Sequence, residues 1–283
     1  MLKSELKKLI PDKLYLKIMY KRIMGKKLNL KNPQTFNEKL QWLKLYDRKP
    51  IYTTMVDKYE VKQFVANIIG EEYIIPTLGV WNSFDDIDFD SLPDRFVLKT
   101  THDSGGVVIC SDKRKMDLDT ARKKLTKSLK NNFYYQGREW PYKNVKPRII
   151  AEKYVIDDIT GELRDYKFFC FDGDPKFMFI ATERQDSRTE TKFDFFDMTF
   201  THMDFRNGHP NAEVIPEKPV SFEKMAELAG KLSAGIPQIR VDFYQANGRI
   251  FFGELTFFHW SGLVPFEPDE WDKKLGDLIT LPQ

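Results

Sequence analysis

The chain begins with segments of helical periodicity and continues with short runs typical of strands. Between residues 33 and 69, apolar residues recur three and four positions apart, which predicts two helices separated near Pro50. Thr35 and Glu38 fit a capping box at the start of the first helix. Beyond residue 70, short runs rich in β-branched and aromatic residues predict strands. Helices followed by antiparallel hairpins indicate an α+β architecture, whereas a doubly wound parallel sheet would alternate the two.

Two hairpins are marked by their turn residues. The strands DYKFFCF and KFMFIAT are joined by DGDP at residues 172–175, and IRVDFY is joined to RIFFGELTF by Asn247-Gly248. One helix is predicted before these hairpins, over residues 117–132, and another between them, over residues 221–234. The later two thirds of the chain are therefore expected to form sheets with a few helices.

The first 31 residues are basic and amphipathic, which predicts a pair of helices. Their basic residues are Lys3, Lys7, Lys8, Lys13, Lys17, Lys21, Arg22, Lys26, Lys27 and Lys31. The simpler interpretation is a solvated helix face docked on the body of the protein. The alternative is weak attraction to an anionic membrane or polymer, and charge alone does not distinguish the two.

Net charge, cysteine placement and the lengths of the apolar stretches indicate which classes of protein to expect. The net charge is +3 with both signs mixed through most of the chain, so nothing at this scale requires a nucleic-acid partner. Cys110 and Cys170 are the two cysteines, and each lies in an apolar run, as expected of reduced core thiols. No stretch has the length of a membrane span, and the broken N-terminus is unlike a signal peptide. A soluble, cytoplasmic protein is expected.

A first chemical pattern is FVLKTTHDSGGVVIC, a strand that ends in Lys99 and leads into a glycine-rich turn. Backbone amides at Gly105 and Gly106 could approach a phosphate closely, with the lysine adding positive charge. The simpler alternative is a hairpin turn beside a surface lysine. A second pattern is RIIAEKYV, where Glu152 and Lys153 interrupt an apolar strand; a nucleotide or an edge-strand ion pair could satisfy them.

A third pattern lies on the two arms of the final hairpin, which carry Arg240 and Asp242 on one strand and Glu254 and Thr256 on the other. Mg²⁺ prefers oxygen ligands and commonly uses one or two carboxylates completed by phosphates. Carboxylates on a solvated strand face are the ordinary alternative. The apolar neighbours in IRVDF and FFGELTFF favour a buried site.

In this order the motifs resemble the ATP-grasp superfamily, most closely the TupA-like branch named for teichuronopeptide biosynthesis. The resemblance runs from PQTFNEKLQWLKLYDRKP through DKYEVKQFVANIIGEEYIIPTLGVW to GELTFFHWSG. It implies an ATP-grasp fold, in which two α+β lobes clasp ATP and a helical region precedes them. The implied division is residues 1–70 for the helical region, 71–155 for a first lobe with the flap, and 156–283 for a second lobe with the metal site.

The resemblance also implies roles for individual residues, with ATP and Mg²⁺ as cofactors. Arg240 would face the acyl phosphate and act with Lys99 in catalysis, and Asp242 and Glu254 would bind magnesium. Thr256 is the third implied metal ligand. It stands where many members of this superfamily have asparagine, which leaves open whether one or two ions bind. His259 is either a substrate contact or a packed histidine, and the second is favoured. The implied nucleotide contacts are Lys58, Lys99, the flap residues Ser104, Gly105 and Gly106, the hinge Glu152, Lys153, Tyr154 and Val155, and Asp165 and Lys167.

The function implied is a carboxylate-amine ligase that works through an acyl phosphate. It would attach an amino acid or amine to a carboxylated sugar or related precursor in surface polysaccharide (capsule) biosynthesis. Two other classes stay open. Asp172-Gly173-Asp174 spells the metal motif of many glycosyltransferases that use sugar nucleotides, although a hairpin turn is favoured there. A non-catalytic module that binds polymer or membrane through its basic N-terminus is the third class. For any of these classes, the alternative to a purely cytoplasmic location is a peripheral one at the inner face of the membrane.

The register of the final hairpin tests the metal site. A two-residue turn at Asn247-Gly248 would set Asp242 opposite Gly253, so that the two carboxylates face opposite sides of the sheet. A three-residue loop with Gly248 in the left-handed conformation would pair Arg240 with Glu254 and give all four polar residues one face. Because the ligase requires a shared face, this second register or an equivalent bulge is predicted, with both carboxylates in the cleft between the lobes.

Overall fold

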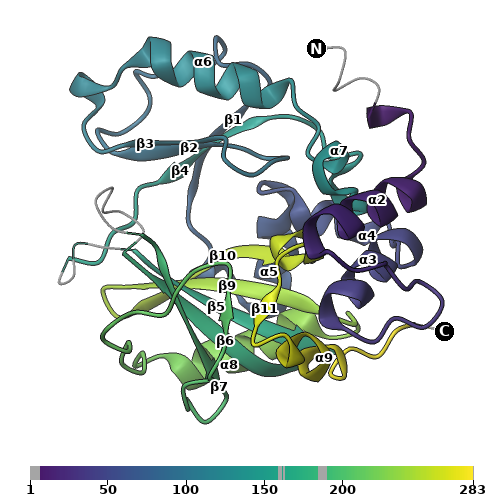
Figure 1. Cartoon of the computed structure of the whole chain (residues 1–283). Coiled ribbons are helices and arrows are strands. Elements are labelled where there is room, and N and C mark those ends of the chain that lie inside the picture. Colours follow the sequence, from purple (N-terminus) through teal and green to yellow (C-terminus); the bar gives the residue numbers. More distant parts are fainter. Residues whose placement is uncertain (1–6, 159–160, 162, 184–189, 283) are drawn as a thin grey trace. The chain divides into compact units, whose positions relative to one another are not determined.

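The computed structural model describes residues 7–158, 161, 163–183 and 190–282 (Figure 1). The chain divides into two compact units, the first formed by Met1–Arg48 and Glu162–Gln283 and the second by Lys49–Gly161. The helical region expected over residues 1–70 is thus shared between the two units. Lys3 lies outside the described residues. Within the ranges described, no helix is long and apolar enough to span a membrane.

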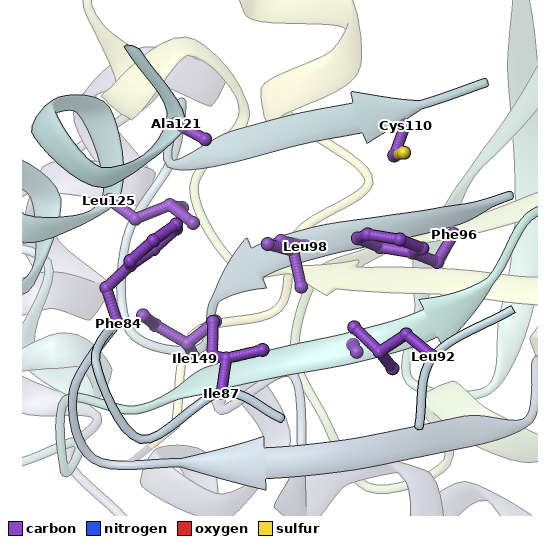
Figure 2. Close-up of a cluster of buried hydrophobic side chains, with 10 residues drawn as sticks. Phe84, Ile87, Leu92, Phe96, Leu98, Cys110, Ala121, Leu125 and Ile149 are labelled. Atoms are coloured by element: carbon purple, nitrogen blue, oxygen red, sulfur yellow. The ribbon is translucent and has the colours of Figure 1, made fainter. Parts of the chain in front are cut away.

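The second unit contains a four-stranded antiparallel sheet with the order β1-β4-β2-β3. One face of this sheet packs its apolar residues, such as Phe96 and Leu98, against Leu125 of the helix α6 (Figure 2). Successive residues of a strand point to opposite faces, so Lys99 and Glu152 lie on the other face. The bounds are β1 Thr77–Trp81, β2 Phe96–Thr100, β3 Val107–Cys110, β4 Ile149–Lys153, α4 Ile51–Val56, α5 Glu60–Ile69, α6 Leu118–Leu129 and α7 Tyr134–Gly137, with 3₁₀ turns at Glu71–Tyr73, Lys113–Lys115 and Trp140–Tyr142.

The first unit contains a five-stranded antiparallel sheet with the order β10-β9-β5-β6-β7 and a small pair, β8 and β11. Helix α8 covers one face, where Phe222 packs on Phe168 with ring centroids 5.8 Å apart (Figure 1). Phe169 and its neighbours form the opposite face, against which Phe36 of α3 packs. The bounds are β5 Arg164–Phe171, β6 Asp174–Thr182, β7 Lys192–Asp197, β8 Arg206–Asn207, β9 Ile239–Ala246, β10 Arg249–Thr256, β11 Phe266–Glu267, α2 Asp12–Met24, α3 Phe36–Tyr46, α8 Phe222–Ser233, α9 Glu270–Gly276 and the 3₁₀ turn η4 His259–Gly262.

Local sequence signals account for many of these boundaries. The capping box of Thr35 and Glu38 is present at the start of α3. The helical stretch after Pro50, expected as one helix, is divided into α4 and α5. At the division, the Asp57 carboxylate accepts hydrogen bonds from the amides of Tyr59 (2.9 Å) and Glu60 (3.3 Å), which satisfies two amides at the start of α5. The two cysteines are buried free thiols, as expected.

Candidate active site

One face of the five-stranded sheet, opposite α8, carries a cluster of charged side chains. Lys167 on β5 pairs with Asp242 on β9, which in turn pairs with Glu254 on β10. Directly paired residues point to the same face, so these three side chains lie side by side across three strands. Arg240 pairs with Thr256 and extends the cluster by one step along the strands. Asp242 and Glu254 thus share a face, as the predicted metal site required.

The shared face results from a bulge at Gly253. The turn at Asn247-Gly248 has two residues, since Ala246 pairs with Arg249 and both turn residues have positive φ, so the expected three-residue loop is wrong. The pairing then shifts by one residue between Phe252 and Glu254, which moves Glu254 opposite Asp242. A Cβ on Gly253 would lie 3.0 Å from the carbonyl oxygen of Asp242, so glycine permits this close approach.

Arg240 is the centre of this cluster. Its Nε and Nη2 donate to the two carboxylate oxygens of Asp242, each at 2.7 Å, in the bidentate geometry that guanidinium and carboxylate favour. Nη2 also lies 3.0 Å from the hydroxyl of Thr256 and 3.2 Å from Oε1 of Glu254. The Phe179 ring lies beneath the guanidinium at 5.8 Å. Arg240 is 8% exposed, so its orientation is fixed by these partners.

Lys167 supplies a second cation to the same carboxylate. Its ammonium contacts Asp242 and lies 3.0 Å from Asp165. Burial raises the pKa of the Asp242 carboxyl, but the charges of Arg240 and Lys167 outweigh burial and lower that pKa to about 2. Asp242 therefore remains ionised across the physiological pH range. The side chain of Glu254, in contrast, is 45% exposed.

His259 fixes Arg240 from the other side. Arg240 Nη1 lies 2.8 Å from Nδ1 of His259, and because arginine only donates, Nδ1 must accept. The proton of the neutral ring is therefore on Nε2, which donates to Oδ1 of Asn207 at 3.0 Å. Burial, and next the charge of Arg240, lower the pKa of His259 well below its usual value. His259 is thus a packed, neutral histidine, as the favoured interpretation predicted.

The backbone after His259 is held by a polar stripe on α3. Asn37, Gln41 and Lys44 follow one another at four and three residues, so they lie on one side of the helix. Gln41 donates to the carbonyls of Ser261 (2.9 Å) and Gly262 (2.8 Å), and fully buried Lys44 donates to the Ser261 carbonyl at 2.7 Å. Asn37 donates to the Val264 carbonyl at 3.1 Å.

These bonds stabilise an unusual backbone. Trp260 and Ser261 have φ of 49° and 56°, in the left-handed region that non-glycine residues rarely adopt. Several donors converge on the carbonyls of this turn, and they offset the conformational cost. The motif FNEKLQWLKLY is therefore a structural support for the turn that carries His259.

The second unit has its own charged cluster, on the sheet face opposite α6. Glu152 is 6% exposed and is bound by Lys62 at 2.5 Å and Lys99 at 2.6 Å. Lys99 is opposite Ile150, two residues from Glu152, so the pair spans adjacent strands diagonally. Burial raises the pKa of Glu152, but Lys99 and Lys62 outweigh burial and lower it. Lys62 also donates to the Ile75 carbonyl at 2.6 Å.

The glycine-rich turn between β2 and β3 has a fixed base and an exposed tip. Buried Asp103 accepts hydrogen bonds from the hydroxyls of Thr100 and Ser128, which lie 2.7 Å from each other. A Cβ on Gly106 would overlap both hydroxyl oxygens, so only glycine fits there. Ser104 and Gly105 are exposed. The ammonium of Lys58 contacts the Asp103 carbonyl, which connects this lysine to the same turn.

A sequence model of the TupA-like ATPgrasp family matches residues 38–280. The chain belongs to the TupA-like ATP-grasp family. Its fold is the mixed α/β fold with antiparallel sheets of ATP-grasp proteins, preceded by N-terminal helices. No curated protein matches the chain.

Several solved structures are similar to parts of this chain. The D-alanine-D-alanine ligase from Bacillus anthracis complexed with ATP is 17% identical, with a TM-score of 0.41, over 72% of this chain and 55% of the ligase. The corresponding ligase from Helicobacter pylori is 14% identical, with a TM-score of 0.43, over 89% and 70%. The ATP-grasp ligase PsnB, complexed with minimal precursor, Mg and ADP, is 9% identical, with a TM-score of 0.42, over 78% and 57%. The chain therefore spans little more than half the length of the first of these ligases.

The residues expected to form the hinge of this ATP-grasp protein differ in burial and in the face of the sheet on which they lie. Glu152 and Lys153 point to opposite faces of β4, and Lys153 is exposed while Glu152 is buried. The amide of Lys153 donates to the Pro76 carbonyl at 3.0 Å. Tyr154 is half-buried beneath the guanidinium of Arg95, at 5.3 Å. Of these residues, only Glu152 contacts Lys62 and Lys99 through its side chain.

The family implies Mg-ATP, and the donor chemistry of the first unit fits one such ion. Asp242, Glu254 and Thr256 present only oxygen atoms on one face, as a hard cation requires. Both oxygens of Asp242 already accept bonds from Arg240, whereas the Glu254 side chain is partly exposed. In the described part of the chain, no three His, Cys, Asp or Glu side chains are grouped as a metal site. A magnesium ion here would depend on phosphate oxygens for its remaining ligands.

Three supporting residues were not anticipated. Lys62 pairs with Glu152, and Asn207 and Lys44 support His259 and its turn. Lys62 lies four residues after Lys58 in DKYEVK, a spacing that would have suggested a common helix face. Asn207 gave no signal, because its partner is 52 residues away in sequence.

Proposed function

We propose that this protein is an Mg-ATP-dependent carboxylate-amine ligase that proceeds through an acyl phosphate. The observation that carries the proposal is the Arg240-Asp242-Lys167 cluster with Glu254 beside it on one sheet face. Fixed cations and carboxylates of this kind are suited to bind a metal-nucleotide and to stabilise charge that develops on transferred phosphate.

The second unit supplies the features expected for nucleotide binding. Lys99 and Lys58 would neutralise phosphate oxygens, and the exposed amides of Ser104 and Gly105 would approach them. Glu152 would accept a hydrogen bond from the adenine amino group, with the backbone of Lys153, Tyr154 and Val155 at the base edge. In the first unit, Asp165 and Lys167 would contact the ribose side of the nucleotide.

The chemistry would proceed in two steps. A carboxylate oxygen of the acceptor attacks the γ-phosphorus of ATP, the bond to the β,γ-bridging oxygen breaks, and ADP leaves. The amine nitrogen then attacks the acyl carbon, phosphate leaves, and the nitrogen loses a proton. Glu254 and Asp242 would hold a magnesium ion, which would supply positive charge to the phosphate oxygens. Arg240 is already oriented by Asp242 and His259, so it can stabilise the acyl phosphate without reorganising.

The finer proposal concerns substrates and location. The resemblance to the TupA-like branch supports a carboxylated sugar or related precursor of a surface polysaccharide as acceptor, an amino acid or amine as donor, and a cytoplasmic site of action. A glycosyltransferase gains no support from DGD at residues 172–174. Asp172 and Gly173 form the β5-β6 turn, with φ of 49° and 85°, and the Asp172 carboxylate accepts the amide of Gly235 at 3.0 Å.

The test is ADP release from Mg-ATP with a panel of carboxylates and amines, including uronic acids and amino acids. Hydroxylamine is added in parallel, because it converts an acyl phosphate into a hydroxamate that can be measured directly. Hydroxamate that depends on ATP and on one class of carboxylate is the expected result. Turnover of a sugar nucleotide without ATP would contradict the ligase and favour glycosyl transfer.

A further inference from the structure

The basic charge of this protein is concentrated at its N-terminus. The first 31 residues carry ten Lys or Arg and two acidic residues, a net charge of +8. The whole chain has a net charge of +3, so the remaining residues carry a net charge of −5. No step of the proposed ligase reaction uses the positive charge of these residues. The excess of positive charge is therefore local to the N-terminal segment.

Helix α2 (Asp12–Met24) is firmly anchored on one side. Tyr15, Leu16 and Tyr20 are at most 5% exposed, and together with Leu28 they form a small core. The Asp12 carboxylate is 2.8 Å from Arg48. The orientation of the helix in the first unit is therefore set by these contacts, and the opposite side is presented to solvent.

That outward side of α2 combines apolar and basic residues. Leu14 is 51% exposed and Ile18 is 50% exposed, and at a spacing of four residues they form a continuous apolar strip. At 100° per residue, Lys17 and Lys21 lie on one side of the strip and Arg22 lies on the other. All three basic residues are exposed. Leu9, which is 80% exposed, extends the apolar character before the helix.

We propose that the outward face of α2 binds the surface of an anionic membrane. An apolar strip flanked by cations is the pattern of helices that lie in the plane of an interface, with the apolar residues among the acyl chains and the cations at the headgroups. A polyanion such as nucleic acid or an acidic polysaccharide would pair with the lysines but leave Leu14 and Ile18 in water. The apolar strip therefore favours a membrane as the partner.

The test uses the full-length protein and sedimentation with vesicles of phosphatidylcholine alone or mixed with phosphatidylglycerol. Binding is expected to the mixed vesicles and to decrease at high salt, because part of the attraction is between charges. Replacing Lys17 and Lys21 by Glu is expected to weaken binding by well over tenfold, since each basic residue contributes about fivefold. The double variant Leu14→Ser, Ile18→Ser is also expected to lose most of the binding.

A matched control distinguishes binding by the outward face of α2 from a general effect of net charge. Lys123 and Lys124 are exposed on α6, and replacing both by Glu makes the same change in net charge elsewhere. That variant is expected to bind like the wild type, and all variants are expected to keep their thermal unfolding temperature and vesicle-free ATP turnover. The proposal fails if the control weakens binding equally, or if Leu14→Ser, Ile18→Ser binds vesicles like the wild type. Tighter binding to double-stranded DNA than to mixed vesicles would also overturn it.

Discussion

At the scale of single residues, each cluster is organised around a buried carboxylate held by two cations. Asp242 has Arg240 and Lys167, and Glu152 has Lys62 and Lys99. Removing one partner of a buried pair normally costs several kcal/mol because the other charge is left unpaired. With two cations per carboxylate, loss of one leaves the carboxylate paired, so a change in activity can be separated from unfolding.

Lys99→Ala is expected to abolish ATP turnover while the fold survives. Lys62 still neutralises Glu152 in this variant, and the Lys99 side chain is 21% exposed, so the cost in stability is small. The loss of a cation at the phosphates is expected to lower kcat by about a hundredfold or more. ATP turnover and thermal unfolding measure the two effects. Lys123→Ala, on the surface of α6, is the matched control, and turnover of Lys99→Ala equal to that control would remove the central support for nucleotide binding.

His259 offers a second residue-scale prediction. His259→Leu removes the acceptor for Arg240 and the donor for Asn207, so two buried groups lose a partner at about 1–3 kcal/mol each. His259→Asn can retain the acceptor, because its Oδ1 occupies roughly the place of Nδ1. Turnover is expected to fall strongly for leucine and to be partly retained for asparagine. Equal turnover in the two variants would show that His259 does not orient Arg240.

At the scale of elements, the β9-β10 hairpin depends on its bulge. Without the shift at Gly253, the two-residue turn would direct Glu254 to the face opposite Asp242. The polar stripe of α3 has a comparable role, because it holds the left-handed turn that carries His259. In both cases a segment outside the charged cluster determines the geometry of the cluster.

Gly253→Val is expected to reduce both stability and activity. The new side chain would collide with the Asp242 carbonyl and the Tyr244 ring, at a cost of about 1–3 kcal/mol. Magnesium-dependent turnover is expected to fall by a larger factor than the loss of stability explains, because Glu254 is displaced from Asp242. Chemical denaturation and the magnesium dependence of turnover measure the two effects. A variant that is destabilised but keeps the wild-type magnesium dependence would contradict the assignment of Glu254 as a ligand.

At the scale of the whole molecule, buried ionisable groups make stability depend on pH. The pKa of His259 is far below its usual value in the folded state, so the unfolded state binds the proton and stability falls as pH drops below about 6.5. The loss is about 1.4 kcal/mol per pH unit until the folded-state pKa is reached. Unfolding free energies of the wild type and His259→Asn at neutral and mildly acidic pH measure it. The wild type should lose more stability than the variant, and parallel losses would refute the assignment.

Features that depend on neighbouring residues in the chain could be predicted from the sequence. Thr35 and Glu38 cap a helix within four residues, and DG at residues 172–173 forms the expected hairpin turn, because these preferences depend on local backbone and side-chain geometry. Lys99 was expected at the end of a strand, and it lies in β2 one residue before the strand ends. The motif order was also sufficient to predict the ATP-grasp family, which the family match confirms.

The pairing of the buried charges depends on tertiary packing and could not be predicted from the sequence. Glu152 was expected to be satisfied by a nucleotide or by an edge-strand ion pair, whereas Lys62 and Lys99 both bind it. A bulge was one of the predicted alternatives, but its position at Gly253 is set by the pairing of β9 with β10. The tautomer of His259 is likewise set by its contact with Asn207. Each of these depends on which distant segments are in contact, and the same local pattern is compatible with several pairings until packing selects one.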